Sequence, residues 1–292
     1  MSATHHSEYL KLASLFLKRA EAAFISDDLI GEQWQRLQYL ERPDYKKAVA
    51  EYRLFEKIFT DLNIDIHYFP SDENVTIDSI YCRDASIATD FGMILCHMGK
   101  ADRINEPGSQ KQSFQQKEVP ILGKITAPGT LEGGDVAWLD EKTLAVGHTY
   151  RTNEEGIRQL KALLEPKGIE VLVVALPHYK GPTDVFHLMS VLSPVDKDLA
   201  VVYSPLMPIK FRNDLLARGF ELVEVPEEEF DSLGCNVLAV APRKCLVAHG
   251  NPKTRAKLTD AGCEIQEYKG EHISVMGGGG PTCLTRPLLR MR

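Results

Sequence analysis

Residues 277–289 read GGGGPTCLTRPLL and combine a very flexible backbone with a single thiol. Four consecutive glycines stabilise neither a helix nor a strand, because glycine loses more backbone freedom on folding than any other residue. They let the backbone approach a bound molecule with its N–H groups free to donate, and Pro281 stiffens the chain just before Cys283. A cysteine held in this way is a candidate nucleophile. A glycine-rich turn followed by a buried cysteine would have the same pattern.

The composition is that of an ordinary globular protein, with 292 residues, of which 43% are hydrophobic and 26% charged. The formal net charge of -7 disfavours nucleic acid or an anionic membrane as a partner. The N-terminus has no apolar signal-peptide core, and no apolar run is long enough to span a bilayer, so we expect a cytoplasmic protein. The 6 cysteines show neither CxxC nor zinc-ligand spacing, which predicts reduced thiols, no metal and no cofactor.

Helical and extended patterns alternate along the chain. Residues 7–23 and 45–62 have the periodicity of helices with one apolar face, and residues 64–69 alternate like a strand. A helical stretch followed by a short strand recurs, with the strands at residues 119–122, 168–174, 219–225 and 262–268. The last three strands follow Gly168, Gly219 and Gly262, each placed as a helix C-cap.

Hairpin-like pairs lie between these units. Their arms are residues 79–89 and 93–97, 135–139 and 143–146, 185–193 and 199–203, and 236–240 and 245–248. The chain thus contains about five copies of a strand–turn–strand–helix–strand unit, spaced by roughly 50 residues as in propeller-like arrays. Residues 1–62 form a mainly helical, abbreviated first copy, whose opening hairpin is reduced to residues 22–26. The stretch after the glycines has no helix behind it and can supply the strand that closes the ring, so we predict one domain over residues 1–292.

Several polar residues interrupt the apolar patterns at the hairpin edges. Arg83-Asp84 interrupts residues 80–87, the acids Glu132 and Asp135 precede the second hairpin, and His187 lies inside an apolar run. Taken singly, these features are also consistent with an ion pair, a turn with capping carboxylates and a core histidine. A ring of repeats would gather all of them, together with Cys283, around its axis.

This set of residues resembles that of the guanidino-group-modifying enzymes, which include dimethylarginine dimethylaminohydrolase, arginine deiminase and the amidinotransferases. The resemblance rests on Arg83-Asp84, on LEGGD at residues 131–135, on His187 and on the glycine-rich loop of Cys283, in this order. It implies an α/β fold, a five-bladed propeller (pentein) with pseudo-fivefold symmetry and an active site on its axis, which agrees with the repeats.

The resemblance also implies roles for individual residues. Cys283 attacks the guanidinium carbon, His187 acts as general acid and then base, and Glu132 pairs with His187. Asp84 and Glu132 hold the guanidinium, as carboxylates pair well with its N–H groups. Arg151 matches an arginine that binds the substrate carboxylate. The predicted substrate-binding residues are Asp84, Arg103, Arg151 and Asp135.

Two departures leave the substrate open. Arginine deiminases carry an aspartate two residues after the histidine, where this chain has Met189, which favours a methylated guanidinium. Dimethylarginine hydrolases usually have Glu-Asp in place of Arg83-Asp84, which argues the other way. We therefore predict a hydrolase of arginine or a methylated arginine that forms citrulline and an amine or ammonia, with a small guanidino molecule as its partner.

The alternatives are an amidinotransferase, an arginine deiminase and, more remotely, a non-catalytic binding protein such as the ribosome anti-association factor with this fold. An agmatine-type deiminase is disfavoured, because a substrate without a carboxylate has no need of Arg151. A homodimer through the exposed edge of the first copy is a further expectation.

Overall fold

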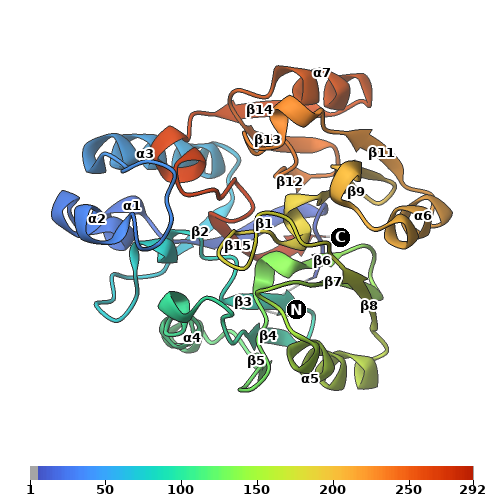
Figure 1. The fold of residues 1–292 in the computed structure, drawn as a ribbon, viewed down its shortest axis with the longest axis horizontal. Coiled ribbons are helices and arrows are strands. Elements are labelled where there is room, and N and C mark those ends of the chain that lie inside the picture. Colours follow the sequence, from blue (N-terminus) through green and yellow to red (C-terminus); the bar gives the residue numbers. More distant parts are fainter. Residues whose placement is uncertain (1–5, 292) are drawn as a thin grey trace.

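The structure is a computed structural model, and it describes residues 6–291. Five three-stranded sheets surround a common centre, and the longer helices lie on the outside (Figure 1). This arrangement confirms the predicted α/β propeller with pseudo-fivefold symmetry. None of the described helices is long and apolar enough to cross a membrane.

Four sheets share one connection pattern: two strands form an antiparallel hairpin, and a helix leads to a third strand parallel to the second. Such a parallel pairing requires a crossover, which the helix provides. These sheets and their helices are β3 (Ser86–Thr89), β4 (Gly92–Leu95), α4 (Glu106–Gln116) and β5 (Ile121–Lys124); β6 (Val136–Trp138), β7 (Thr143–His148), α5 (Glu154–Leu164) and β8 (Glu170–Ala175); β9 (Leu192–Asp196), β10 (Leu199–Val202), α6 (Ile209–Ala217) and β11 (Glu221–Glu224); and β12 (Leu238–Ala241), β13 (Lys244–Ala248), α7 (Pro252–Asp260) and β14 (Glu264–Tyr268).

Glycines end three of the helical crossovers as predicted. Gly168, Gly219 and Gly262 have φ angles of 79°, 87° and 81°, in the left-handed region that glycine adopts without steric cost. Each is followed within two residues by the third strand of its sheet.

The fifth sheet joins the two ends of the chain. Its order is β15-β1-β2, with β15 (Thr285–Met291) antiparallel to β1 (Lys11–Leu17) and β1 parallel to β2 (Asp65–Tyr68). The connection from β1 to β2 contains α1 (Ala20–Phe24), α2 (Asp27–Gln33) and α3 (Tyr45–Asp61). The prediction that the last apolar stretch closes the ring against the first copy is therefore confirmed.

The structure corrects the prediction for the start of the chain. Residues 7–23 do not form a helix, because β1 occupies their middle, and α1 replaces the hairpin predicted at residues 22–26. Within residues 6–62 the first repeat has one strand, β1, and three helices, and β15 supplies the edge strand of its sheet. The cause of the error is that Leu15, Phe16 and Leu17 are all buried in the centre of a sheet, so their apolar run lacks the alternation that marks a half-exposed strand.

Candidate active site

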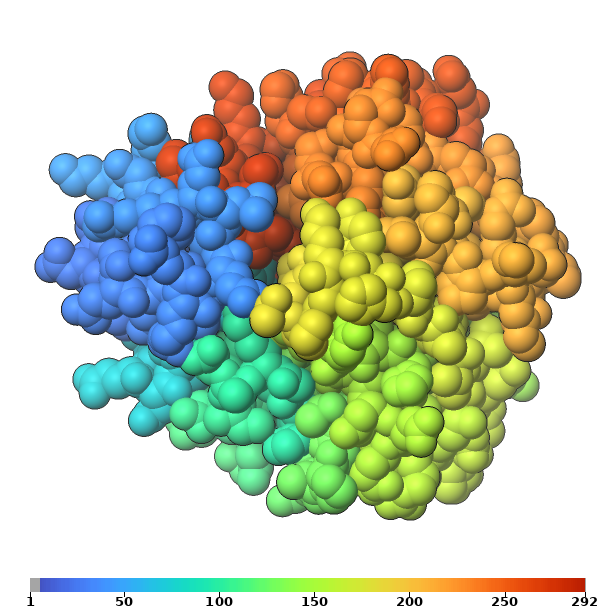
Figure 2. Space-filling view, in the orientation of Figure 1, coloured from blue at the N-terminus to red at the C-terminus, as the bar shows by residue number. Residues whose placement is uncertain are grey.

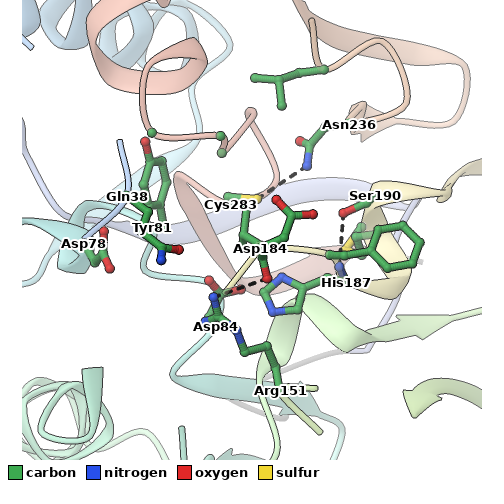
Figure 3. A pocket seen from close by; sticks show the side chains of 18 of the residues that line it. Gln38, Asp78, Tyr81, Asp84, Arg151, Asp184, His187, Ser190, Asn236 and Cys283 are labelled. Atoms are coloured by element: carbon green, nitrogen blue, oxygen red, sulfur yellow. Dashed lines mark hydrogen bonds between the residues drawn. The ribbon is translucent and has the colours of Figure 1, made fainter. Parts of the chain in front are cut away.

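A cavity of about 410 Å³ opens at the centre of the ring. Asp84, Arg151, His187 and Cys283 line it together, so the structure brings these predicted residues to one place. The loop from β8 to β9, which is yellow in Figure 2, lies over the centre of this face and covers part of the cavity. Figure 3 shows the side chains that point into it.

The polar residues at the centre occupy equivalent positions in the repeats. In each of the five sheets, the edge strand nearest the centre of the ring begins two to five residues after one of them (Figure 1). These residues and the strands that follow are Asp84 before β3, Glu132 before β6, His187 before β9, Asn236 before β12 and Cys283 before β15. The two hairpin arms predicted from residues 79 and 185 start later than expected, because the chain turns towards the centre there before it becomes a strand.

Cys283 differs from the other cysteines by its access to the cavity. It is partly exposed, whereas the five others are buried. The Nδ2 group of Asn236 donates to Sγ of Cys283 over 3.4 Å, and Oδ1 of Asn236 accepts from the backbone N–H and the hydroxyl of Thr282. Burial raises the pKa of Cys283, Asp84 raises it further, and the bonds from Thr282 and Asn236 lower it in part. Without a substrate, the sulfur is therefore held as a thiol.

Close packing explains the glycines before Cys283. A Cβ atom at Gly277 or Gly279 would overlap the ring of Tyr81, and one at Gly280 would overlap Asn236. Gly278 has a φ angle of 73°, which favours glycine. The glycine run therefore lets the chain pass tightly around Tyr81 and deliver Cys283 to the cavity.

His187 and Glu132 form a buried ion pair. Nε2 of His187 lies 2.8 Å from Oε2 of Glu132, and their side chains are 5% and 0% exposed. Burial opposes a charge on His187, but Asp135, the bond to Glu132 and the charge of Asp84 outweigh it and raise the pKa of His187 to about 9. Burial also opposes the charge of Glu132, yet the bond from His187 and the charge of Arg151 hold the pKa of Glu132 well below its usual range. The imidazole is therefore protonated at neutral pH.

Asp84 presents one free oxygen. Its Oδ2 accepts from Nη1 of Arg103 over 2.6 Å, while its buried Oδ1 has no hydrogen-bond partner among the described residues. Gly134 makes this possible, because a Cβ there would lie 2.7 Å from Oδ1 of Asp84 and 2.5 Å from Nδ1 of His187. A buried carboxylate oxygen without a donor is suited to receive an N–H group from a ligand.

The contacts of Arg103 correct its predicted role. It also lines the cavity. Four hydrogen bonds from Nε, Nη1 and Nη2 go to Glu106, Asp84 and the carbonyl of Tyr81. No pair of N–H groups is left for a substrate carboxylate, so Arg103 instead orients Asp84.

The prediction for Asp135 also needs correction. Asp135 is fully buried, and its carboxylate accepts from the hydroxyls of Thr149 and Thr152 and from the backbone N–H of Leu188. It does not line the cavity. It holds the turn that follows His187 and contributes to the raised pKa of His187.

Arg151 is the less firmly held arginine of the cavity. Its Nη1 group lies 3.4 and 3.5 Å from the oxygens of Glu132, and its Nη2 group lies 3.5 Å from the carbonyl of Asp184. These contacts are longer than a strong ionic hydrogen bond. The guanidinium can therefore exchange them for a ligand carboxylate at small cost.

Asp84, Glu132 and His187 could also be read as a metal site, because their ligand atoms all lie within 4.8 Å of one another. A metal requires a neutral imidazole with a free lone pair. The raised pKa of His187 and its bond to Glu132 favour the protonated ring instead, so the three groups suit an organic cation better than a metal ion.

Three further groups that line the cavity are not among the residues predicted from the sequence. Asn236 bonds Cys283, and Asp78 forms an ion pair of 2.7 Å with Lys100. Asp184 belongs to the covering loop, and Figure 3 shows its side chain directed into the cavity between Cys283 and His187. Only Asn236 had a signal in the sequence, namely its place just before a hairpin strand, as for Asp84 and Cys283.

Known proteins have sequences similar to this chain. A family model described as N,N dimethylarginine dimethylhydrolase, eukaryotic, matches residues 21–290. N(G),N(G)-dimethylarginine dimethylaminohydrolase from Pseudomonas aeruginosa is 29% identical over 251 residues, which cover 82% of this chain and 89% of that protein. Arginine deiminase from Listeria welshimeri is 29% identical over 213 residues, which cover 61% of this chain and 51% of that protein.

Solved structures show the same fold. A variant of the Pseudomonas aeruginosa enzyme in complex with citrulline has a TM-score of 0.77 at 24% identity, over 96% of this chain and 100% of that chain. An amidinotransferase of saxitoxin biosynthesis from Microseira wollei has a TM-score of 0.81 at 14% identity, over 100% and 98% of the two chains. At these identities the structures establish the fold alone. The family model matches residues 21–290, which are most of this chain. The chain therefore belongs to the N,N dimethylarginine dimethylhydrolase family of guanidino-group-modifying enzymes.

Proposed function

We propose that this protein hydrolyses the guanidino group of arginine or a methylated arginine to citrulline and an amine or ammonia. The observation that carries the proposal is the shared cavity of a partly exposed thiol, a protonated imidazole and a carboxylate oxygen without a donor. A guanidinium fits this set because it is a planar cation with several N–H groups around an electrophilic carbon. Its leaving nitrogen needs a proton, which His187 can supply.

Substrate binding prepares the nucleophile. The guanidinium donates to Oδ1 of Asp84, and its positive charge beside Cys283 lowers the pKa of the thiol, which burial and Asp84 otherwise raise. The thiol proton passes to water as the thiolate forms. The carboxylate of the substrate takes the N–H groups of Arg151 that now make long contacts to Glu132 and Asp184.

Two displacements then follow at the guanidinium carbon. The thiolate of Cys283 forms a C–S bond, His187 gives its proton to the departing nitrogen, and the C–N bond breaks to leave a cationic S-alkylthiouronium and a neutral imidazole. His187 next takes a proton from water while the hydroxide adds to the same carbon. The C–S bond breaks, the sulfur recovers a proton, and the ureido product is released with His187 protonated again.

The cavity wall favours a methylated substrate. Met189 and Phe186 line the cavity beside His187 and are almost fully buried, so they offer apolar contact to methyl groups. A methyl group transferred to such a surface contributes roughly 0.8 kcal/mol. The relatives named dimethylarginine dimethylaminohydrolase support the same preference.

The test is a product screen with arginine, monomethylarginine, dimethylarginine and agmatine. We expect a ureido product and a stoichiometric amine or ammonia from the amino acids, with the highest kcat/KM for a methylated arginine. Cys283→Ser should abolish turnover and leave Tm unchanged, because a hydroxyl is a far weaker nucleophile at neutral pH. Cys263→Ser, at a buried cysteine that does not line the cavity, is the matched control and should retain turnover.

Other outcomes would contradict the proposal. A ureido product that forms equally fast in Cys283→Ser would exclude this nucleophile. Turnover only in the presence of an acceptor amine, with a new guanidino compound as the product, would show an amidinotransferase instead of a hydrolase.

A further inference from the structure

Three arginines are buried together at the hub without lining the active-site cavity. Arg83, Arg286 and Arg290 are 2%, 5% and 1% exposed. Arg83 precedes β3, and the other two belong to β15, the strand that closes the ring. Their closeness follows from the bond that Nη1 of Arg286 donates to the carbonyl of Arg83. A guanidinium stays charged in proteins, so this cluster concentrates positive charge in the interior.

Within residues 6–291, one carboxylate forms an ion pair with this cluster, and it pairs with Arg83 alone. Nη2 of Arg83 donates to both oxygens of Glu8, over 2.8 and 2.9 Å. Glu8 also accepts from the backbone N–H of Trp138 over 3.4 Å. Its single negative charge balances one arginine. No other ion pair with Arg83, Arg286 or Arg290 is formed within residues 6–291.

The remaining contacts of these arginines are to backbone carbonyls. Arg286 donates to the carbonyl of Ser86 over 2.7 Å, and Arg290 donates to the carbonyls of Leu10 and Ala239. A carbonyl satisfies an N–H group but cancels no charge. Nε and Nη1 of Arg83, and Nε and Nη2 of Arg290, are buried and have no acceptor in the described part of the chain.

The electrostatics of the cluster agree with a surplus of positive charge. Burial, followed by the charge of Arg83, lowers the pKa of Arg286 to about 9, and Glu8 opposes this in part. Burial and Arg83 likewise lower the pKa of Arg290 to about 10, again against Glu8. Both groups remain protonated at neutral pH, and a buried charge without a counter-charge is strongly destabilising.

We propose that Arg83 and Arg290 bind a small inorganic anion of the chloride class, which shares the hub with Glu8. The buried N–H groups without acceptors provide the donors, and the two surplus cations provide the charge. A monatomic anion suits the site better than phosphate or sulfate, because all three arginines are at most 5% exposed and a larger, more highly charged ion loses more hydration energy on burial. The anion would join Arg83, which pairs with Glu8 of the N-terminal segment, to Arg290 of β15.

The test measures Tm and does not depend on turnover. For the wild-type protein, sodium gluconate is replaced stepwise by sodium chloride at constant ionic strength. Gluconate serves as the reference because it is too large to enter the arginine cluster. We expect a saturable rise of Tm with chloride, a similar rise with bromide, and none with gluconate or sulfate. Arg290→Gln, which keeps donor groups but removes one charge, should lose the chloride dependence. Arg158→Gln, at an exposed arginine of α5, should keep it.

A crystal grown with bromide gives the direct measurement. Anomalous density between Arg83 and Arg290 would establish the site even if Arg290→Gln fails to fold. Bromide found at the surface alone would be an adventitious ion only and would overturn the proposal. Equal Tm values in chloride and gluconate would also overturn it.

Discussion

Nε2 of His187 lies 2.8 Å from Oε2 of Glu132, and both side chains are almost completely withdrawn from solvent. Together with the charge of Asp135, this pairing keeps the imidazole protonated above its ordinary pKa, and the carboxylate of Glu132 stays charged. A general acid that is charged at rest is what a poor nitrogen leaving group requires. The same pairing links the chemistry of the site to the stability of the fold.

The raised pKa of His187 predicts a pH-dependent contribution to stability. Folding raises this pKa from 6.5 to about 9, so the contribution is complete below pH 6.5 and is lost as the pH rises through about 9. The shift corresponds to on the order of 3 kcal/mol. Urea denaturation of wild type and His187→Gln from pH 6 to pH 10 should therefore show a stability difference that shrinks with pH. A constant difference would mean that His187 is not protonated in the folded protein.

Asn236 should lower the pKa of the Cys283 thiol. Asn236→Ala removes the bond to Sγ and both bonds that position Thr282, so the thiolate loses a donor. A hydrogen bond to a charged group contributes roughly 1.5–3 kcal/mol, which predicts a fall in kcat by about tenfold to a hundredfold. The rate of Cys283 alkylation against pH should shift to higher pH. An unchanged alkylation profile would leave Asn236 with a structural role only.

Arg151 and Arg103 should respond differently to replacement by alanine. Arg151→Ala removes a loosely held guanidinium, so we expect KM to rise for arginine-type substrates and not for agmatine. Arg103→Ala leaves Asp84 and Glu106 buried without their cation, which should cost about 3–5 kcal/mol of stability. Equal losses of stability in both variants would show that Arg151 is structural as well.

Gly134 should not tolerate a side chain. In Gly134→Ala the new Cβ would lie 2.5 Å from Nδ1 of His187 and 2.7 Å from Oδ1 of Asp84, so the acid and the free carboxylate oxygen must both move. We expect a loss of turnover larger than the loss of stability. Gly108→Ala is the control, because nothing lies within 4 Å of a Cβ there, and it should stabilise α4 slightly. Normal activity of Gly134→Ala would contradict the described arrangement.

Asp184 should assist substrate binding from the covering loop. Its side chain points into the cavity, and no ion pair engages its carboxylate among the described residues. Asp184→Asn should therefore raise KM for cationic substrates with a smaller effect on kcat. Asp231→Asn is the comparison, because Asp231 also lines the cavity but pairs with Lys180. A fall in kcat at constant KM would place Asp184 in the chemical step instead.

The sequence predicts most of this architecture because four of the repeats are contiguous in the chain. The capping glycines and hairpin turns mark those units locally, so Gly168, Gly219 and Gly262 are found where expected. The fifth unit combines β1 and β15 from opposite ends, and its buried central strand has the apolar continuity of a core helix. Long-range pairing of this kind leaves no local signal.

Within the site, the residues whose side chains have distinctive chemistry are the ones that the sequence predicts best. Cys283, His187 and Glu132 have side chains whose chemistry suggests a role. In the structure Cys283 and His187 line one cavity, and the buried Glu132 pairs with His187. Asn236 has an unspecific amide in an apolar run, and only its place in the repeat distinguishes it. Arg103 and Asp135 were assigned by their charge, whereas their partners Glu106 and Thr152 become known only in three dimensions.

The pairing of β15 with β1 has a consequence for the order of folding. Lys11 and Met291 are paired across almost the whole described chain, so this contact closes a very long loop and costs more chain entropy than a local hairpin. The four contiguous blades can form from nearer contacts first. We therefore expect Cys283 to reach the centre late in folding, because it lies just before the strand that closes the ring.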